Sequence, residues 1–227
     1  MLAEGAGIFI VENYERALAR GARSYRRNRG LRKQRDIDRN KPASGLFDSM
    51  KLALANAGRS INDVDYISAY GTGDPILDAA EVAAIKQLFG ARAYEIPMSS
   101  IKGVTGNALG ASGPLQVIAS ALAIRDRQIP PTANLRSFDP SCDLDFVPCQ
   151  PRRAKIDCAL INVRGIGGSA STLRYSIGWL TNEQRDNSHY CGAARSGLVW
   201  LSQSFKPTPS AARTNASSCC RWRSVFG

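Results

Sequence analysis

Histidine is nearly absent from this sequence, because only one of its 227 residues, His189, is a histidine. Histidine is the side chain most often used for proton transfer near neutral pH, and it is a common zinc ligand. The cysteines add no metal motif, since none of them forms a C-x-x-C pair; they are Cys142, Cys149, Cys158, Cys191, Cys219 and Cys220. We therefore expect free thiols, no metal site and no cofactor.

Long apolar runs are missing as well. No stretch approaches the roughly 18 residues of a membrane span, and the first residues lack the basic-then-apolar layout of a secretory signal. The hydrophobic share of 44% is ordinary for a globular protein, and 227 residues suffice for one sizeable core. We expect a cytoplasmic protein with no membrane partner.

Acidic residues are scarce in the two segments that carry the net charge. Residues 23–35 hold seven Lys and Arg and no acid, and residues 175–227 hold six basic and two acidic residues, which together account for the formal charge of +11. Clustered Lys and Arg can bind nucleic-acid phosphates whatever the base sequence. The first segment has one Tyr for base stacking, and the aromatics of the second are scattered. Nucleic-acid binding is therefore an alternative that the sequence does not favour.

The most distinctive stretch, residues 99–114, reads Ser-Ser-Ile-Lys-Gly-Val-Thr-Gly-Asn-Ala-Leu-Gly-Ala-Ser-Gly-Pro. A short apolar run leads into it, glycines and an asparagine turn the backbone, and an apolar helix follows. Such a turn can aim backbone N–H groups and a polar side chain into a cleft. The alternative is a tight turn that needs small residues between two packed elements.

Strand and helix patterns alternate along the chain. Residues 44–57 and 78–89 show helical periodicity, and residues 115–124 are apolar nearly all round, which predicts a helix buried between layers. Strands are predicted at residues 4–12, 65–70, 97–100 and 154–162, the first of them buried. Alternation of this kind is typical of an α/β architecture.

Three glycine-containing motifs, at residues 66–75, 99–114 and 162–168, resemble the C-terminal half of β-ketoacyl-acyl-carrier-protein synthases. The resemblance extends over residues 2–25 and 43–173 and includes residues 129–135 and 142–148. It implies a thiolase-like fold, here an incomplete C-terminal α/β repeat of the layered α/β/α/β/α architecture. Residues 1–174 would be this half-domain, with the N-terminal half missing, and residues 175–227 a disordered or non-family tail.

The basic segment interrupts that resemblance. Where the family has a small-residue strand, this chain has residues 26–35, so residues 23–42 read as an atypical basic insertion or a frame slip. One back-translation of residues 27–35, read one base later, gives Gly-Ile-Ala-Gly-Tyr-Gly-Ser-Asn, which is similar to the family strand. A local frame slip and a true surface loop remain alternatives.

By resemblance the function is that of an acyltransferase that condenses acyl groups in fatty-acid or polyketide synthesis, with acyl carrier protein as partner. The family's nucleophilic cysteine belongs to the missing half. Its two histidines, which bind the thioester carbonyl, correspond to Tyr70 and Asn107. Both can donate a hydrogen bond, but neither titrates near neutral pH.

Other site residues follow from the same resemblance. Lys102 matches a lysine beside the family's active site, and Glu81 matches an acid expected to pair with it, although that ion pair can serve only to order the turn. Positions implied near the substrate or oxyanion are Thr72, Gly165, Ile166 and Gly167. Arg164 stands where the family has an aromatic residue, which puts acyl binding in doubt.

We expect this chain to be inactive alone. One alternative is a non-catalytic partner of a full-length synthase, similar to a chain-length factor, and a homodimer is a further possibility. The other is a basic protein that binds nucleic acid or acidic carrier protein. Loss of half the fold would leave an apolar face exposed, so we expect dimerisation or aggregation.

Overall fold

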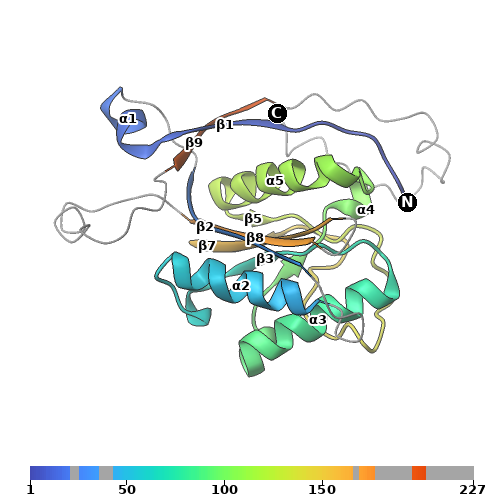
Figure 1. The fold of residues 1–227 in the computed structure, drawn as a ribbon. Helices are drawn as coiled ribbons and strands as arrows, with labels where there is room; N and C mark the ends of the chain where they lie inside the picture. The colour runs from blue at the N-terminus through green and yellow to red at the C-terminus, as the bar shows by residue number, and fades with distance from the viewer. Residues whose placement is uncertain (21–25, 36–42, 166–168, 177–195, 203–227) are drawn as a thin grey trace.

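A computed structural model describes residues 1–20, 26–35, 43–165, 169–176 and 196–202 (Figure 1). The strands are β1 (Ile8–Asn13), β2 (Arg26–Arg35), β3 (Tyr66–Ser68), β4 (Met98–Ser99), β5 (Gln128–Ile129), β6 (Arg152–Arg153), β7 (Cys158–Arg164), β8 (Ser169–Ser176) and β9 (Ser196–Ser202). The helices are α1 (Tyr14–Ala19), α2 (Ser44–Asn56), α3 (Pro75–Phe89), α4 (Lys102–Thr105) and α5 (Ser112–Asp126), with short 3-10 turns at Ile61–Asp63, Gly90–Tyr94 and Leu109–Ala111.

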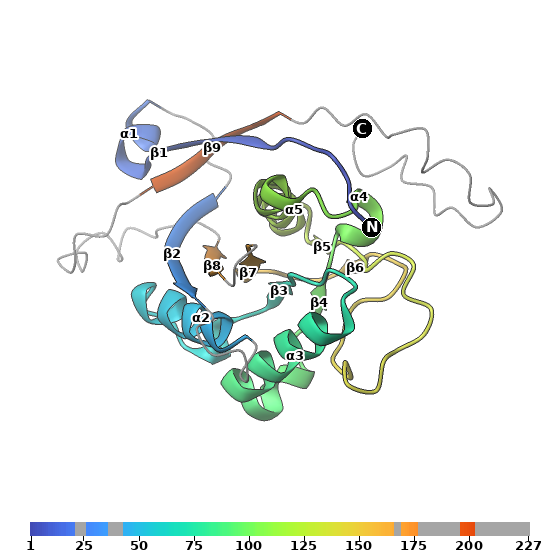
Figure 2. The same cartoon turned by 45° about the vertical axis from the view of Figure 1, so that its right-hand side comes forward.

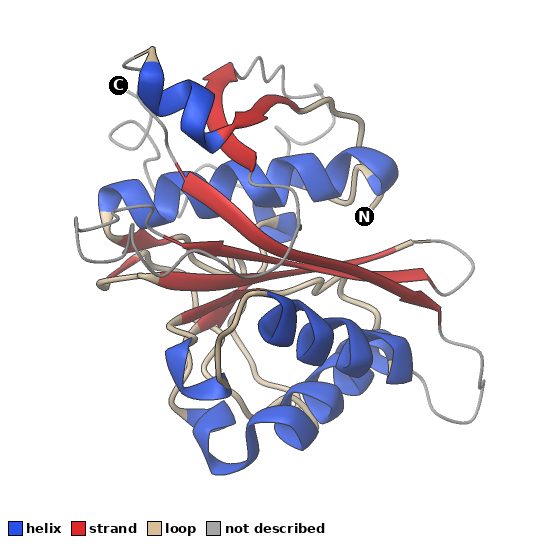
Figure 3. Ribbon diagram, turned by 60° about the vertical axis from the view of Figure 1, so that its left-hand side comes forward, coloured by secondary structure: helices blue, strands red, loops and turns tan. Residues whose placement is uncertain are grey.

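The main sheet has seven strands in the order β1-β9-β2-β8-β7-β3-β4. Strand β3 runs parallel to both β4 and β7, whereas the other pairs are antiparallel. Helices α2 and α3 cover one face and α5 covers the other (Figure 3). The predicted α/β architecture is therefore confirmed.

Helix α5 lies between two layers of strands, as its apolar sequence predicts. The strands β7 and β8 lie beneath it, and β1 and β9 cross above it (Figure 2). Three of its buried residues are nevertheless polar, Ser112, Gln116 and Ser120. The first two take part in the site described below.

Hydrophobic clusters fill both sides of the sheet, because side chains of a strand alternate between its faces. On β7, Leu160 packs in the cluster under α2 and α3, while the next residue, Ile161, packs in the cluster under α5. Among the largest buried side chains are Leu46, Met50 and Ile85 on the first side and Tyr66, Ile124 and Tyr175 on the second. This two-sided core fixes the ends of β3, β4 and β7, from which the pocket is built.

Strand β1 is not buried as predicted. Ile8, Ile10 and Val11 are 75%, 53% and 50% exposed. The strand lies at the edge of the sheet and, among the described residues, pairs with β9, so most of its apolar side chains stay half or more exposed. The apolar pattern correctly indicated a strand but could not show whether another layer covers it.

The basic segment is a strand rather than a surface loop. Residues 26–35 form β2, which pairs with β8 along most of its length and with β9 at its start. Residues 196–202 of the expected tail form β9. The rest of the segment 23–42 and of the tail lies largely outside the described residues.

Candidate functional site

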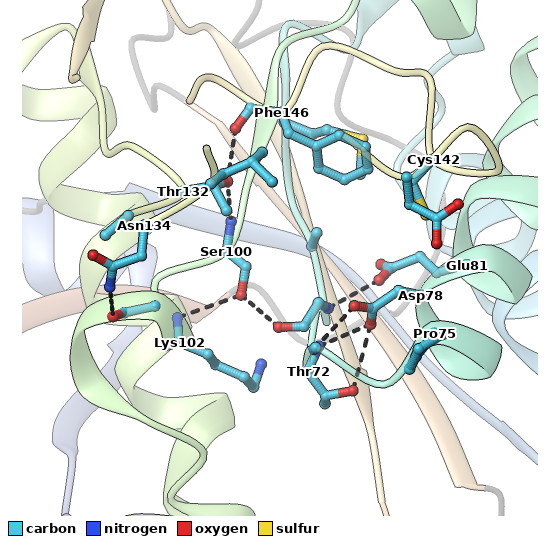
Figure 4. Close-up of a pocket in the computed structure, with 18 of the residues that line it drawn as sticks. Thr72, Pro75, Asp78, Glu81, Ser100, Lys102, Thr132, Asn134, Cys142 and Phe146 are labelled. Carbon is cyan, nitrogen blue, oxygen red and sulfur yellow. Dashed lines mark hydrogen bonds between the residues drawn. The ribbon is translucent and has the colours of Figure 1, made fainter. Parts of the chain in front are cut away.

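A pocket of about 560 Å³ lies at the ends of β3 and β4 (Figure 4). Its walls come from the turn after β3, the first turns of α3, the start of α4 and the loop between β5 and β6. The lining residues include Gly71, Thr72, Asp78, Glu81, Lys102, Asn107, Thr132, Phe138, Cys142 and Phe146. Segments far apart in the sequence therefore meet at the predicted glycine turns.

Two carboxylates hold the turn after β3. Glu81 accepts hydrogen bonds from the backbone N–H groups of Tyr70 and Gly71 at 3.0 and 3.1 Å. Asp78 accepts from those of Thr72 and Gly73, both at 2.9 Å. The two acids can act together because residues three apart lie on one face of a helix.

Helix α3 begins where it does for a local reason. The side chain of Asp74 caps it by accepting from the backbone N–H groups of Ile76 and Leu77, and Pro75 occupies the first turn, where its missing N–H costs nothing. This start places Asp78 and Glu81 against the turn. Burial raises the pKa of both carboxyls, and for Glu81 the N–H donors oppose that rise.

The two glycine turns are joined by Ser100. Its hydroxyl donates to the carbonyl oxygen of Gly71 at 2.7 Å and accepts from the backbone N–H of Lys102 at 3.3 Å. Gly71 has φ near +35°, and a Cβ there would lie 2.7 Å from the Cβ of Ser100. A side chain at position 71 is thus excluded both by backbone conformation and by contact.

Lys102 is buried, with 9% of its surface exposed, and lines the pocket. Its Nζ donates to the carbonyl oxygen of Tyr70 and, at 3.3 Å, to Oε1 of Gln116, and it lies 4.8 Å from the centre of the Tyr70 ring. Burial lowers the pKa of Lys102 to about 8, although the negative charges of Glu81 and Asp78 oppose this.

The expected ion pair between Lys102 and Glu81 does not form. Among the described residues, the Glu81 carboxylate takes its hydrogen bonds from the turn and from Nδ2 of Asn162, at 3.1 Å. The Lys102 amine is left with a carbonyl and an amide oxygen. Glu81 therefore holds the turn through backbone N–H groups and not through the ion pair that both interpretations assumed.

Gln116 connects the buried polar groups. Its Nε2 donates to the carbonyl oxygens of Ala69 at 2.8 Å and Asn162 at 3.1 Å, and these belong to the ends of β3 and β7. The orientation of its amide is therefore fixed, with Oε1 directed at Lys102. Sequence reasoning missed this residue, although a glutamine in a helix apolar nearly all round was a visible signal.

The Asn107 side chain has a defined orientation. Its Oδ1 accepts from the backbone N–H of Leu109 at 3.2 Å and from the Ser112 hydroxyl at 3.0 Å. Among the described residues no acceptor is recorded for its Nδ2, and the residue lines the pocket. The arrangement leaves an amide donor at the cavity wall.

The structure brings together most of the predicted site residues. Tyr70, Lys102 and Glu81 are linked through the turn, and Thr72 and Asn107 line the pocket. Gly165 lies outside the lining, at the end of β7, where its N–H donates to the carbonyl of Ser169 at 2.7 Å. Ile166 and Gly167 lie outside the described residues.

Arg164 is not among the residues that line the pocket, but its positive charge lies near enough to Tyr70 to oppose the rise that burial causes in the pKa of that phenol. In the described part of the chain, no three His, Cys, Asp or Glu side chains come together as a metal site would require. No helix within the described ranges has the length and apolar character needed to cross a membrane.

Comparison with known proteins identifies the relatives of this fold. Residues 24–136 match the sequence family described as "Beta-ketoacyl synthase, C-terminal domain". The "3-oxoacyl-[acyl-carrier-protein] synthase 2" of Coxiella burnetii is 44% identical over 177 residues, which are 76% of this chain and 43% of that protein. The "Nodulation protein E" of Rhizobium meliloti is 40% identical, over 77% of this chain and 44% of that protein.

Solved structures give the same result. "The ishigamide ketosynthase/chain length factor" superposes with a TM-score of 0.75 at 34% identity, over 79% of this chain and 44% of that chain. A β-ketoacyl synthase from Burkholderia phymatum STM815 gives a TM-score of 0.69 at 31% identity, over 74% and 41%. This chain thus spans less than half the length of the relatives it matches.

Proposed function

Because the chain belongs to the β-ketoacyl synthase family, whose C-terminal domain it carries, we propose that its pocket binds the thioester-linked acyl group of an acyl carrier protein. The reaction class is the decarboxylative condensation of fatty-acid or polyketide synthesis. The relatives named above support this class, and one solved complex, at 32% identity and a TM-score of 0.70, is described as a type II acyl-carrier protein with its ketosynthase. The location that goes with this function is the cytoplasm.

The observation that carries the proposal is the fixed amide of Asn107. Its oxygen is held by Leu109 and Ser112, so the free donor is Nδ2. A donor aimed from a preorganised turn stabilises negative charge on a thioester oxygen without needing to reorient. Asn107 is thus the thioester-binding donor, in the place of one family histidine.

Proton transfer is the function that these residues do not supply. An amide does not titrate, and burial raises the pKa of Tyr70 further above its ordinary value of 10.0. We therefore assign carbonyl binding to Asn107, which lines the pocket, and to Tyr70, which adjoins the lining residues Ala69 and Gly71, while Lys102 and Glu81 hold the turn. Thr72 serves at the substrate side. Of the positions Gly165, Ile166 and Gly167, we assign the oxyanion role to the last two, because the N–H of Gly165 already donates to Ser169.

This assignment makes the chain inactive in condensation on its own, because the nucleophilic cysteine would come from another segment or subunit. We assign residues 1–174 to the synthase half-domain, residues 23–42 to a basic insertion or frame slip within it, and residues 175–227 to a tail outside it. A second candidate is a non-catalytic partner of an active synthase. The similarity to a ketosynthase/chain length factor structure favours it.

The test is binding of a non-hydrolysable malonyl-thioester mimic, followed by calorimetry, with release of carbon dioxide from malonyl-pantetheine measured in parallel. We expect binding without carbon dioxide release. Asn107→Asp should weaken binding by roughly 10-fold or more, since it replaces the donor with a like-charged acceptor. The matched control is Asn62→Asp in the turn Ile61–Asp63, away from the pocket, and it should bind as the wild type does.

Equal binding by wild type and Asn107→Asp would refute the role of the amide. Carbon dioxide release by the wild type would refute the assignment of a non-catalytic site. Co-purification with a full-length synthase separates the two candidates, because only the partner function requires a stable complex.

A further inference from the structure

We propose that the Lys102 amine is a nucleophile that captures a small keto or aldehyde compound in this pocket as a Schiff base. The inference goes beyond the acyl-binding function and does not depend on it, because the reacting group is a free carbonyl and no carrier protein is needed. It rests on how the amine is held. Family resemblance did not assign this chemistry to the lysine.

The amine has two fixed acceptors and no carboxylate partner. Nζ donates to the carbonyl oxygen of Tyr70 and to Oε1 of Gln116, and Glu81 is occupied by N–H groups of the turn. A neutral amine has two N–H bonds, which these acceptors satisfy, and keeps one lone pair. An ammonium group has a third N–H, for which the described residues offer no oxygen acceptor but only the face of the Tyr70 ring, 4.8 Å from Nζ.

The acceptors cannot easily move to suit an ammonium group. The Gln116 amide is held by the carbonyls of Ala69 and Asn162, and the Tyr70 peptide is held by Glu81. Both anchors are buried, since Gln116 is 1% exposed and Glu81 2% exposed. The site is thus built around two donors from Nζ.

Three groups that face the amine favour its charged form, namely the Tyr70 ring at 4.8 Å and the carboxylates of Glu81 and Asp78. Burial outweighs them, and the pKa of Lys102 falls to about 8. At about pH 8, about half of this amine is then neutral, against about 0.3% for an ordinary lysine. Desolvated lysines of this kind are the ones that form Schiff bases in proteins.

The pocket suits a small β-keto compound. Its volume of about 560 Å³ is within the range of ligand sites, and Leu135, Phe138 and Phe146 provide apolar lining. The Nδ2 of Asn107, which also lines the pocket, can donate to a second oxygen of the ligand. An acetoacetyl group offers both a keto carbon and such an oxygen.

The chemistry requires no further reactant. The lone pair of the neutral amine attacks the keto carbon, and the nitrogen loses a proton to the new alkoxide oxygen, which gives a carbinolamine. Loss of that hydroxyl and of the remaining amine proton as one water molecule forms the C=N bond. The step is a condensation with no change of oxidation state.

The experiment is reductive trapping on the intact chain. Acetoacetyl-N-acetylcysteamine is added with cyanoborohydride across a pH series, and the labelled peptides are quantified by mass spectrometry. We expect the Lys102 peptide to gain the reduced adduct, with a half-maximal rate near the pKa of about 8. The reference is Lys51, an exposed lysine of α2 in the same sample.

The expected advantage over Lys51 is about 10-fold at about pH 8. At this pH the neutral fraction of Lys102 is about 150-fold larger than that of an ordinary lysine. An amine of lower pKa is also a weaker nucleophile, and the dependence known for thiols lowers the reaction rate by about 15-fold. Equal labelling of both lysines, or a half-maximal rate above about pH 10, would overturn the proposal. Both readouts come from the wild-type chain, so no variant has to fold.

A second probe separates this inference from the proposed function. Acetaldehyde has a carbonyl group but no thioester. Labelling of Lys102 by acetaldehyde, combined with no binding of the malonyl-thioester mimic, would support the amine chemistry and refute acyl binding. Binding of the mimic with no labelling by either carbonyl probe would support acyl binding and refute the amine chemistry.

Discussion

Replacing Gln116 by leucine should destabilise the fold measurably, although the change looks favourable in an apolar helix. The side chain is 1% exposed, and it makes bonds of 2.8 and 3.1 Å to the carbonyls of Ala69 and Asn162 and one of 3.3 Å from Lys102. Each lost bond that leaves a buried group unpaired costs about 1–3 kcal/mol, while leucine regains part of this by apolar burial. We expect a net loss of about 2–4 kcal/mol.

Urea denaturation followed by circular dichroism measures this loss. With a urea dependence of about 1–3 kcal/mol per molar, the midpoint should fall by about 1 M or more. The matched control is Gln87→Leu, an exposed glutamine in helix α3, which should stay within about 0.5 kcal/mol of the wild type. If Gln116→Leu unfolds at the same urea concentration as Gln87→Leu, the hydrogen bonds read from the structure do not stabilise it.

The charged variant Gln116→Glu tests the same geometry through Lys102. A carboxylate next to Nζ should raise the pKa of Lys102 from about 8 by about 1–3 units. The pH at which a lysine reagent modifies the Lys102 amine at half its maximal rate should rise by the same amount. An unchanged pH of half-maximal modification would show that position 116 does not face the amine.

Two more perturbations address the turn after β3. Burial raises the pKa of Glu81, so the folded protein binds the carboxyl proton more tightly than the unfolded chain does. The protonated carboxyl therefore contributes to stability in full below the ordinary pKa of 4.5. That contribution is lost as the pH rises through the raised pKa. The unfolding free energy of wild type minus that of Glu81→Gln should therefore fall as the pH rises above the ordinary pKa of 4.5, and a rise measured in urea melts would contradict this. Gly71→Ala should cost about 1–3 kcal/mol, since its φ is +35° and the new Cβ would lie 2.7 Å from that of Ser100, whereas Gly110→Ala has nothing within 4 Å and should melt as the wild type does.

Local sequence signals predicted the elements around the site well. The helix predicted at residues 44–57 is Ser44–Asn56, and the one predicted at residues 78–89 is Pro75–Phe89, lengthened by its Asp-Pro start. Capping and apolar periodicity act within a few residues, so they can be read from the chain directly. The predicted burial of β1 was wrong, because the burial of a strand depends on which other elements pack against it.

The α/β class, the family resemblance and the residues that meet at the glycine turns could all be predicted from the amino-acid sequence. The hydrogen-bond partners of those residues could not, because they become visible only in the folded chain. Glu81 faces backbone N–H groups, and Gln116, 14 residues beyond Lys102, supplies its acceptor. Hydrogen-bond partners are selected by which strand and helix ends converge, and that depends on long-range packing of the whole core, which no local pattern encodes.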